Sequence, residues 1–274
     1  MKLTLKKFDI TTIRDDSVCV FIAARNSGKT VLVKDILYYK RDMPVGTIIS
    51  PTEDSNRAFS SIIPSPFIHD GYSPEIIDKV LKRQKLVISQ AAKEVATYGK
   101  TQLDPRAFLV MDDCMFDNDW KKDKNIRYIF SNGRHRKLML LMTLQYVIGI
   151  PPDLRANIDY VFIMREKNYQ NRRKLYDLYC GVFPTYDMFC KVMDVVTEGY
   201  GCLVIDNTSR SNKLTDNVFW YEAEMHPNFT IGSRELWEMH NNCLNQDDDD
   251  EEPFDPNKLR PKRNSQPITV RKMF

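Results

Sequence analysis

The feature that most constrains the fold of this 274-residue sequence is an apolar run, residues 18–22, that leads directly into a loop of small and polar residues. The run V-C-V-F-I is uninterrupted, which is typical of a strand buried on both faces of a sheet. Residues 28–40 then carry apolar side chains at helical spacing. A buried strand joined by a short loop to a helix predicts an alternating β/α fold with parallel strands.

The loop between this strand and this helix reads A-A-R-N-S-G-K-T, residues 23–30. It matches the phosphate-binding pattern G-x-x-x-x-G-K-[ST], with alanine at the first glycine. In that pattern Gly28 lets the backbone approach the phosphates, Lys29 reaches the β- and γ-phosphates, and the Thr30 hydroxyl binds Mg²⁺. We therefore expect ATP or GTP to bind here with Mg²⁺. The expected cofactor-binding residues are Ala23, Ala24, Arg25, Asn26, Ser27, Gly28, Lys29 and Thr30.

The rest of the sequence alternates between apolar runs and helical patterns. The runs predict strands at 45–50, 107–111, 138–144, 160–164, 202–205 and 218–221. The helical patterns cover 74–96, 120–130, 168–180 and 184–197. Strands separated by helices require crossover connections, so we expect an α/β fold with a mainly parallel central sheet flanked by helices.

Two aspartates, Asp112 and Asp113, follow the apolar strand 108–111. An acid at the end of such a strand is typical of the Walker B motif, in which Asp112 would hold Mg²⁺. A second acid beside the Mg²⁺ ligand marks hydrolases, so Asp113 would orient and deprotonate the attacking water. Many such enzymes have glutamate there. Aspartate is one methylene shorter, so the water would have to lie closer.

A third motif surrounds the expected strand 138–144. Gln145 ends this strand and would contact the γ-phosphate or the attacking water as a sensor, with Thr143 as the weaker choice. The segment N-G-R-H-R, residues 132–136, precedes the same strand. Arg134 or Arg136 could enter a neighbouring subunit's site as an arginine finger. The alternative is that these arginines are surface charge or contact DNA phosphates.

Together, the loop 23–30, the Asp112-Asp113 pair, the segment 132–135 and Gln145 resemble the genome-packaging ATPases of nucleo-cytoplasmic large DNA viruses. These are the poxvirus-type branch of the FtsK/HerA superfamily of P-loop ATPases. The resemblance covers roughly residues 15–222. It implies a RecA-like P-loop NTPase fold of the ASCE type, with extra strands toward the C-terminus. It also implies a ring of subunits, pentamer or hexamer, that hydrolyses ATP to translocate double-stranded DNA into a capsid.

The same resemblance implies particular partners and residues. The catalytic set would be Lys29, Asp112, Asp113, Arg134 and Gln145. Arg134 becomes the preferred finger, with Arg136 second, and Arg155 could also face a subunit interface. The DNA contact would be independent of sequence, and a viral capsid or portal component would be a further partner. The expected location is the host cytoplasm at viral assembly sites, or the virion.

Three other functions must be compared with this one, and the match to a GTPase is rejected. A P-loop nucleoside or nucleotide kinase would need an acceptor pocket and a lid, but not a second acid after Walker B. The arginines that could form such a lid are Arg165, Arg172 and Arg173. A GTPase would need the guanine-binding pattern N-K-x-D, whereas residues 212–216 place the aspartate one position too late. A capsid-associated protein with a vestigial site is disfavoured because Lys29, Thr30 and Asp112 are all intact.

Composition sets the remaining limits. The formal net charge of +3 does not by itself indicate a nucleic-acid-binding protein. No apolar run is long enough to span a membrane, and the N-terminus has no signal-peptide pattern. The six cysteines include no C-x-x-C, and the four histidines are scattered, so we expect free buried thiols in a reducing compartment and no zinc site.

The charge is distributed unevenly along the chain. Residues 247–252 are all acidic, and the bases and prolines that follow them make a long helix unfavourable. We therefore expect a P-loop ATPase domain over residues 1–244 and a charged, mostly disordered tail over 245–274.

Overall fold

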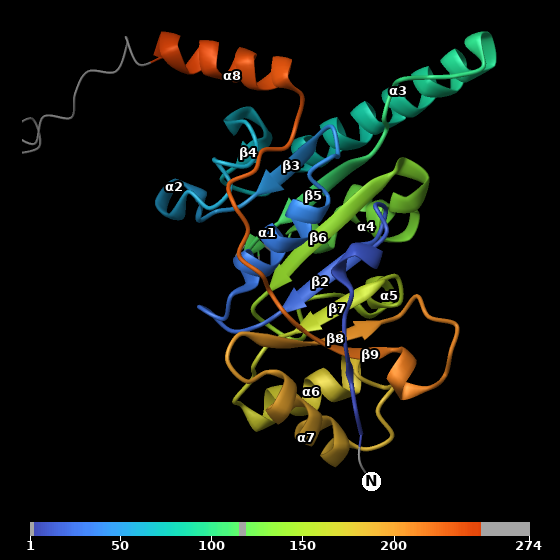
Figure 1. Ribbon diagram of the computed structural model, residues 1–274, viewed down its shortest axis with the longest axis vertical. Coiled ribbons are helices and arrows are strands. Elements are labelled where there is room, and N and C mark those ends of the chain that lie inside the picture. The colour runs from blue at the N-terminus through green and yellow to red at the C-terminus, as the bar shows by residue number, and fades with distance from the viewer. Residues whose placement is uncertain (1–2, 115–118, 248–274) are drawn as a thin grey trace, which may run out of the picture.

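The computed structural model describes residues 3–114 and 119–247, and within these the chain builds a single large sheet. Its strands are β1 (Lys6–Lys7), β2 (Val18–Ile22), β3 (Gly46–Ile49), β4 (Ile68–His69), β5 (Ala107–Met111), β6 (Leu138–Leu144), β7 (Tyr160–Ile163), β8 (Gly201–Asp206) and β9 (Val218–Glu222). Their order is β1-β9-β8-β7-β2-β6-β5-β3-β4 (Figure 1). Only the β7–β8 and β8–β9 pairs are antiparallel among the described strands. The predicted α/β class, RecA-like with additional C-terminal strands, is confirmed.

Helices cover both faces of this sheet. They are α1 (Lys29–Tyr39), α2 (Glu53–Asn56), α3 (Pro74–Tyr98), α4 (Lys124–Asn132), α5 (Pro152–Arg155), α6 (Tyr169–Tyr179), α7 (Tyr186–Val196) and α8 (Arg234–Asp247). Short 3-10 helices are η1 (Ile10–Thr12), η2 (Ser65–Phe67), η4 (Asp119–Lys121), η5 (Gly133–Arg136) and η6 (Leu214–Asp216). Helix α1 packs on one face, whereas α3 to α7 contribute to the apolar core on the other. The central strands are buried on both faces, as their uninterrupted apolar runs predict.

Capping residues explain where the helices begin. Ser73 caps α3 by accepting the Glu75 N–H, and Pro74 occupies the first helical position, where no backbone donor is needed. The predicted helix 120–130 is instead the 3-10 turn η4 followed by α4. The cause is Asp123, whose carboxylate accepts the Asn125 N–H at 2.7 Å and starts a new helix there.

The segment after β9 returns across the α1 face toward β3 (Figure 1). The fully buried carboxylate of Asp35, on α1, accepts hydrogen bonds from the Tyr221 hydroxyl at 2.8 Å and the Glu224 N–H at 3.0 Å. The Nε2 atom of His226 lies 2.6 Å from the other Asp35 oxygen. These contacts attach the returning segment to the helix that follows the phosphate-binding loop.

The C-terminal region differs from the sequence expectation in one respect. Helix α8 continues to Asp247, three residues beyond the expected domain boundary at 244. The tail was predicted over residues 245–274, and its residues 248–274 lie outside the described residues. Within the described part of the chain, no helix is long and apolar enough to cross a membrane.

Candidate active site

The predicted nucleotide-binding residues meet at the carboxyl edge of the parallel strands. Strand β2 runs into the loop 23–30, and its neighbour β6 is paired in register, with Ile22 opposite Leu144. Strand β5 is paired with β6, with Met111 opposite Met142. The residues that follow these three strands therefore lie side by side, which is where open α/β sheets bind ligands.

The loop 23–30 adopts the backbone geometry that a phosphate-binding nest needs. Gly28 has a positive φ of 91° and directly precedes α1, while Asn26 has a φ of 57°. The Lys29 ammonium group donates to the carbonyl oxygens of Ala23 at 3.0 Å and Ala24 at 2.8 Å. Burial lowers the pKa of Lys29, although the negative charges of the two aspartates after β5 oppose that shift. A phosphate oxygen could replace these carbonyls as the partner of the ammonium group.

Asp112 lies at the base of the site and is 3% exposed. Its two carboxylate oxygens accept hydrogen bonds from the Thr30 hydroxyl at 3.3 Å and the Thr143 hydroxyl at 2.8 Å. Burial raises the pKa of Asp112, and the hydrogen bond from Thr143 acts in the opposite direction. A hydroxyl and a carboxylate in contact are the oxygen donors that Mg²⁺ prefers, so Thr30 and Asp112 fit the predicted metal site.

Asp113 is held in an unusual backbone conformation, with a φ of 54°. Its N–H donates to the Thr143 hydroxyl at 2.9 Å, and its carboxylate accepts a hydrogen bond from the Gln145 side-chain amide. Arg25 in turn donates to the Gln145 carbonyl oxygen at 3.2 Å. The structure thus brings Asp113, Gln145 and Arg25 into one hydrogen-bonded row.

Thr143 has a role that the sequence did not indicate. It was the weaker choice for a phosphate sensor, but it is buried and its hydroxyl joins the Asp112 carboxylate to the Asp113 backbone. Because one hydroxyl fixes both aspartates, Thr143 is a positioning residue. Motif spacing could not reveal this, since the contact depends on the register between β5 and β6.

Arg134 lies at the opposite, amino edge of the sheet. It belongs to η5, just before β6, whereas Gln145 follows the other end of that strand. The seven residues of β6 span about 23 Å at roughly 3.3 Å per residue, so Arg134 is remote from its own phosphate-binding loop. Arg134 therefore does not contact a nucleotide bound at the loop of its own chain.

Arg134 shares a buried carboxylate with a second arginine. It donates to the Asp159 Oδ1 atom at 2.5 Å, and Arg14 donates to the same atom at 3.3 Å. The other Asp159 oxygen accepts the N–H of Val18, the first residue of β2, at 2.9 Å. The Asp159 side chain is 4% exposed, whereas both arginines are about half exposed. Arg14 also lies 3.7 Å from the Asp16 carboxylate, so two arginines are shared between two aspartates here.

The two other arginines predicted for a subunit interface also have partners within the chain. Arg136 donates to the Tyr128 hydroxyl at 3.0 Å and lies over that ring. Arg155 donates to the Ile150 carbonyl at 2.8 Å. Neither residue is brought to the phosphate-binding loop of its own chain. Two of the arginines considered for a kinase lid are likewise ion-paired, Arg172 to Asp194 and Arg173 to Asp177.

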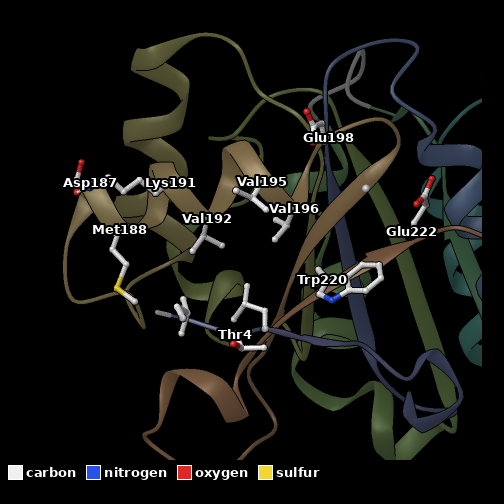
Figure 2. Close-up of a pocket in the computed structure, with 13 residues that line it drawn as sticks. Thr4, Asp187, Met188, Lys191, Val192, Val195, Val196, Glu198, Trp220 and Glu222 are labelled. Atoms are coloured by element: carbon white, nitrogen blue, oxygen red, sulfur yellow. Dashed lines mark ion pairs between the residues drawn. The ribbon is translucent and has the colours of Figure 1, made fainter. Parts of the chain in front are cut away.

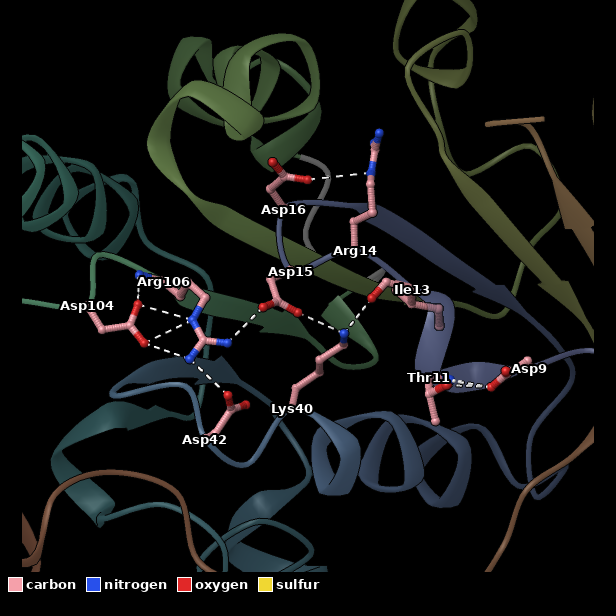
Figure 3. Close-up of polar contacts among 10 residues, drawn as sticks. All are labelled: Asp9, Thr11, Ile13, Arg14, Asp15, Asp16, Lys40, Asp42, Asp104 and Arg106. Atoms are coloured by element: carbon pink, nitrogen blue, oxygen red, sulfur yellow. Dashed lines mark hydrogen bonds and ion pairs between the residues drawn. The ribbon is translucent and has the colours of Figure 1, made fainter. Parts of the chain in front are cut away.

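An ion-pair network, absent from the sequence predictions, closes the amino edge. Arg106 bridges three carboxylates, those of Asp15, Asp42 and Asp104, at 2.7–2.9 Å (Figure 3). Lys40, at the end of α1, binds Asp15 at 2.7 Å. Hydrogen bonds to Asp104 and Asp15 raise the pKa of Arg106. Asp15 precedes β2, Asp104 and Arg106 precede β5, and Lys40 and Asp42 follow α1. The network therefore links the starts of these strands to the end of the helix.

A cavity of about 770 Å³ lies elsewhere, between α7, β9 and the residues before β1 (Figure 2). Met188, Val192 and Trp220 give it an apolar lining, and Lys191 and Glu222 lie at its margin. It is on the α7 face of the sheet, opposite α1. None of the predicted nucleotide-binding residues lines this cavity, so it does not extend the candidate site.

The fold and the carboxyl edge define a RecA-like P-loop NTPase domain. No family model matches the chain. It is 38% identical to "Uncharacterized protein L437" of Acanthamoeba polyphaga mimivirus over 245 residues, 89% of this chain and 85% of that protein. It is 39% identical to "Uncharacterized protein 075L" of Invertebrate iridescent virus 6 over 229 residues, 80% of this chain and 83% of that protein. The chain therefore belongs to the family of large-DNA-virus proteins that these two represent.

Among solved structures, the fold is similar to the genome packaging NTPase B204 of Sulfolobus turreted icosahedral virus 2, in complex with sulfate. The TM-score is 0.50 with 14% sequence identity, over 78% of this chain and 99% of that one. At 14% identity, this similarity shows a shared fold and nothing further.

Proposed function

We propose that this protein is an ATP-hydrolysing motor that moves double-stranded viral DNA into a capsid as a ring of identical subunits. The observation that carries the proposal is the convergence of Lys29, Thr30, Asp112, Asp113 and Gln145 at one edge of a parallel sheet. The packaging role is supported by the fold shared with B204, a genome packaging NTPase, and by the viral relatives.

The proposed steps of ATP hydrolysis follow from the hydrogen bonds that connect the residues of the site. Thr30 and Asp112 would hold Mg²⁺, which when bound neutralises charge on the β- and γ-phosphate oxygens. Asp113 would take a proton from water while the water oxygen bonds to the γ-phosphorus and the bond to the ADP oxygen breaks. Gln145 would orient that water, since it already contacts Asp113. The products are ADP and inorganic phosphate.

Arg134 would complete the site of the neighbouring subunit. Its place at the amino edge suits a head-to-tail contact, in which the amino edge of one subunit faces the carboxyl edge of the next, and such contacts close into rings. If Arg134 leaves Asp159, Arg14 remains as a cation beside that buried carboxylate, and it also pairs with Asp16. Arg136 and Arg155 remain second choices, and each is held within its own chain, Arg136 by the Tyr128 hydroxyl and Arg155 by the Ile150 carbonyl.

The remaining parts of the proposal concern partners and location. The DNA contact would be made to phosphates, so it would be independent of sequence and weakened by salt. A capsid or portal component would receive the DNA. The motor would work in the host cytoplasm at viral assembly sites, a reducing compartment, and the free thiols of Cys19, Cys180 and Cys202 are consistent with that.

The proposal is tested by the ATP hydrolysis rate with and without linear double-stranded DNA. We expect turnover that DNA stimulates and that Lys29→Ala abolishes. Nucleosides are included as alternative acceptors. A phosphorylated nucleoside as product would replace the motor with a kinase, and turnover that survives in Lys29→Ala would refute the assignment of the loop.

A further inference from the structure

Tyr200 is an exposed aromatic residue in a rigid turn. It follows Gly199, whose φ of 61° favours glycine, and precedes Gly201, the first residue of β8. A Cβ atom on Gly201 would lie 2.3 Å from the Val196 carbonyl oxygen, so only glycine fits where β8 leaves the end of α7. The turn is thus fixed on both sides of Tyr200, yet the Tyr200 residue is 66% exposed.

The Tyr200 ring lies against the phosphate-binding loop. Its Cδ1 atom is 3.4 Å from the position that a Cβ atom on Gly28 would occupy, which is van der Waals contact. Gly28 is the last residue of the loop before α1. An exposed aromatic ring placed beside the loop is not explained by packing in the core, because the core would bury it.

The direction of a bound nucleotide follows from the sheet order. The γ-phosphate must face Asp112, Asp113 and Gln145, which follow β5 and β6 on one side of β2. A nucleoside triphosphate is an extended chain from the γ-phosphate to the base. Its nucleoside end must therefore leave the loop on the other side of β2, where β7 and β8 lie. Because β8 is antiparallel to β7, its first residue is at this same carboxyl edge, next to Tyr200.

We propose that the Tyr200 ring stacks on the base of the nucleotide and forms one wall of the nucleoside site. This inference rests on the proposed ATP site. Stacking uses the π-face that every base presents, so Tyr200 would contribute affinity without choosing between adenine and guanine. The two flanking glycines set the backbone path that brings the Tyr200 ring to the loop.

The test compares Tyr200→Ala, Tyr200→Phe and a matched control, Tyr98→Ala, in the full chain. Tyr98 is similarly exposed but ends α3, far along the chain from the loop. The measurements are kcat and KM for ATP and for GTP, and the inhibition constant of tripolyphosphate, which has no base. We expect Tyr200→Ala to raise both KM values about tenfold, as removal of a base-stacking ring does, with kcat changed less than about twofold.

Tripolyphosphate discriminates stacking from support of the loop. Its inhibition constant should be unchanged in Tyr200→Ala, and Tyr200→Phe and Tyr98→Ala should match the wild type. An equal loss of tripolyphosphate affinity would mean that the ring only supports the loop, and unchanged KM values would likewise overturn the inference. If Lys29→Ala is inactive while Tyr200→Ala is unaffected, only the stacking proposal fails. If Lys29→Ala remains active, the proposed function itself fails.

Discussion

The two ends of the same parallel strands carry polar groups of different kinds. At the carboxyl edge, Lys29 and Thr30 make hydrogen bonds that a bound phosphate or ion could replace. At the amino edge, Arg106 and Lys40 are fixed by carboxylates of the same chain. The difference indicates that the carboxyl edge is prepared for a ligand and the amino edge is mainly structural.

Arg134 is the exception at the amino edge. It shares its carboxylate with Arg14, so its removal leaves Asp159 paired. Arg106, by contrast, is the cation that three carboxylates share. Moving Arg134 away would break one ion pair, with Arg14 still beside Asp159. Moving Arg106 away would break three ion pairs at once. The predictions below test this distinction, beginning with the largest expected effect.

The largest effect is expected for Arg134→Ala. Removal of an arginine finger costs about 10³–10⁵ in kcat in other enzymes, and we expect a loss in this range with ATP affinity nearly unchanged. The matched control is Arg14→Ala, which removes the longer contact to the same Asp159 oxygen together with an ion pair to Asp16. Steady-state hydrolysis by both variants is the measurement. Equal losses in the two would show that Arg134 acts only by neutralising Asp159.

Asp113→Asn should have the next largest effect. Loss of a general base costs about 10²–10⁴ in rate, while asparagine keeps the size of the side chain and can still bond to Gln145. Single-turnover hydrolysis and nucleotide binding should be measured together. We expect the chemical step to slow and the affinity for ATP to remain within about threefold. Normal single-turnover rates would exclude Asp113 as the base.

Arg106→Ala tests the structural character of the amino edge. Three carboxylates lose their shared partner, so we expect the free energy of unfolding to fall by about 1–3 kcal/mol with kcat unchanged at 25 °C. Arg106→Lys keeps the charge but loses the planar fork, and it should recover part of the loss. Denaturant unfolding measures both. A fall in kcat with no loss of stability would place Arg106 in the catalytic machinery.

Asp112→Asn should have the smallest effect on the stability of the fold. It should raise that stability, whereas Arg106→Ala lowers it. Burial raises the pKa of Asp112, so its ionised form is less favourable in the folded state than in the unfolded chain. This cost is absent below the unfolded-state pKa and increases as pH rises through the folded-state pKa. Asparagine removes it, so Tm at pH 7 should rise while Mg²⁺-dependent hydrolysis is lost. A lower Tm would contradict the assigned cost.

The sequence was most informative where function depends on contiguous residues. The loop 23–30, the Asp112-Asp113 pair and Gln145 could be found because each follows an apolar strand, and parallel strands bring their ends together. Strand positions were predicted well for the same reason, since the central strands are uninterrupted apolar runs. Helix α8 was missed because it begins in a stretch with few apolar residues.

Contacts between distant segments could not be read from the sequence. Thr143 was considered only as the weaker choice for a phosphate sensor, and Asp159 was not singled out. Their roles depend on register and on the packing of strand ends. Tyr200 was not singled out because its neighbour Gly28 lies far away in sequence.

The central claim is that each active site combines the carboxyl edge of one subunit with Arg134 of the next. The most direct test mixes two inactive variants, Lys29→Ala and Arg134→Ala, at varying ratios. An Arg134→Ala subunit keeps an intact phosphate-binding loop, and a Lys29→Ala neighbour can supply the arginine. We predict that the mixture regains DNA-stimulated ATP hydrolysis, with a maximum near equal amounts. No recovery at any ratio, when both variants still enter rings with the wild type, would contradict the account.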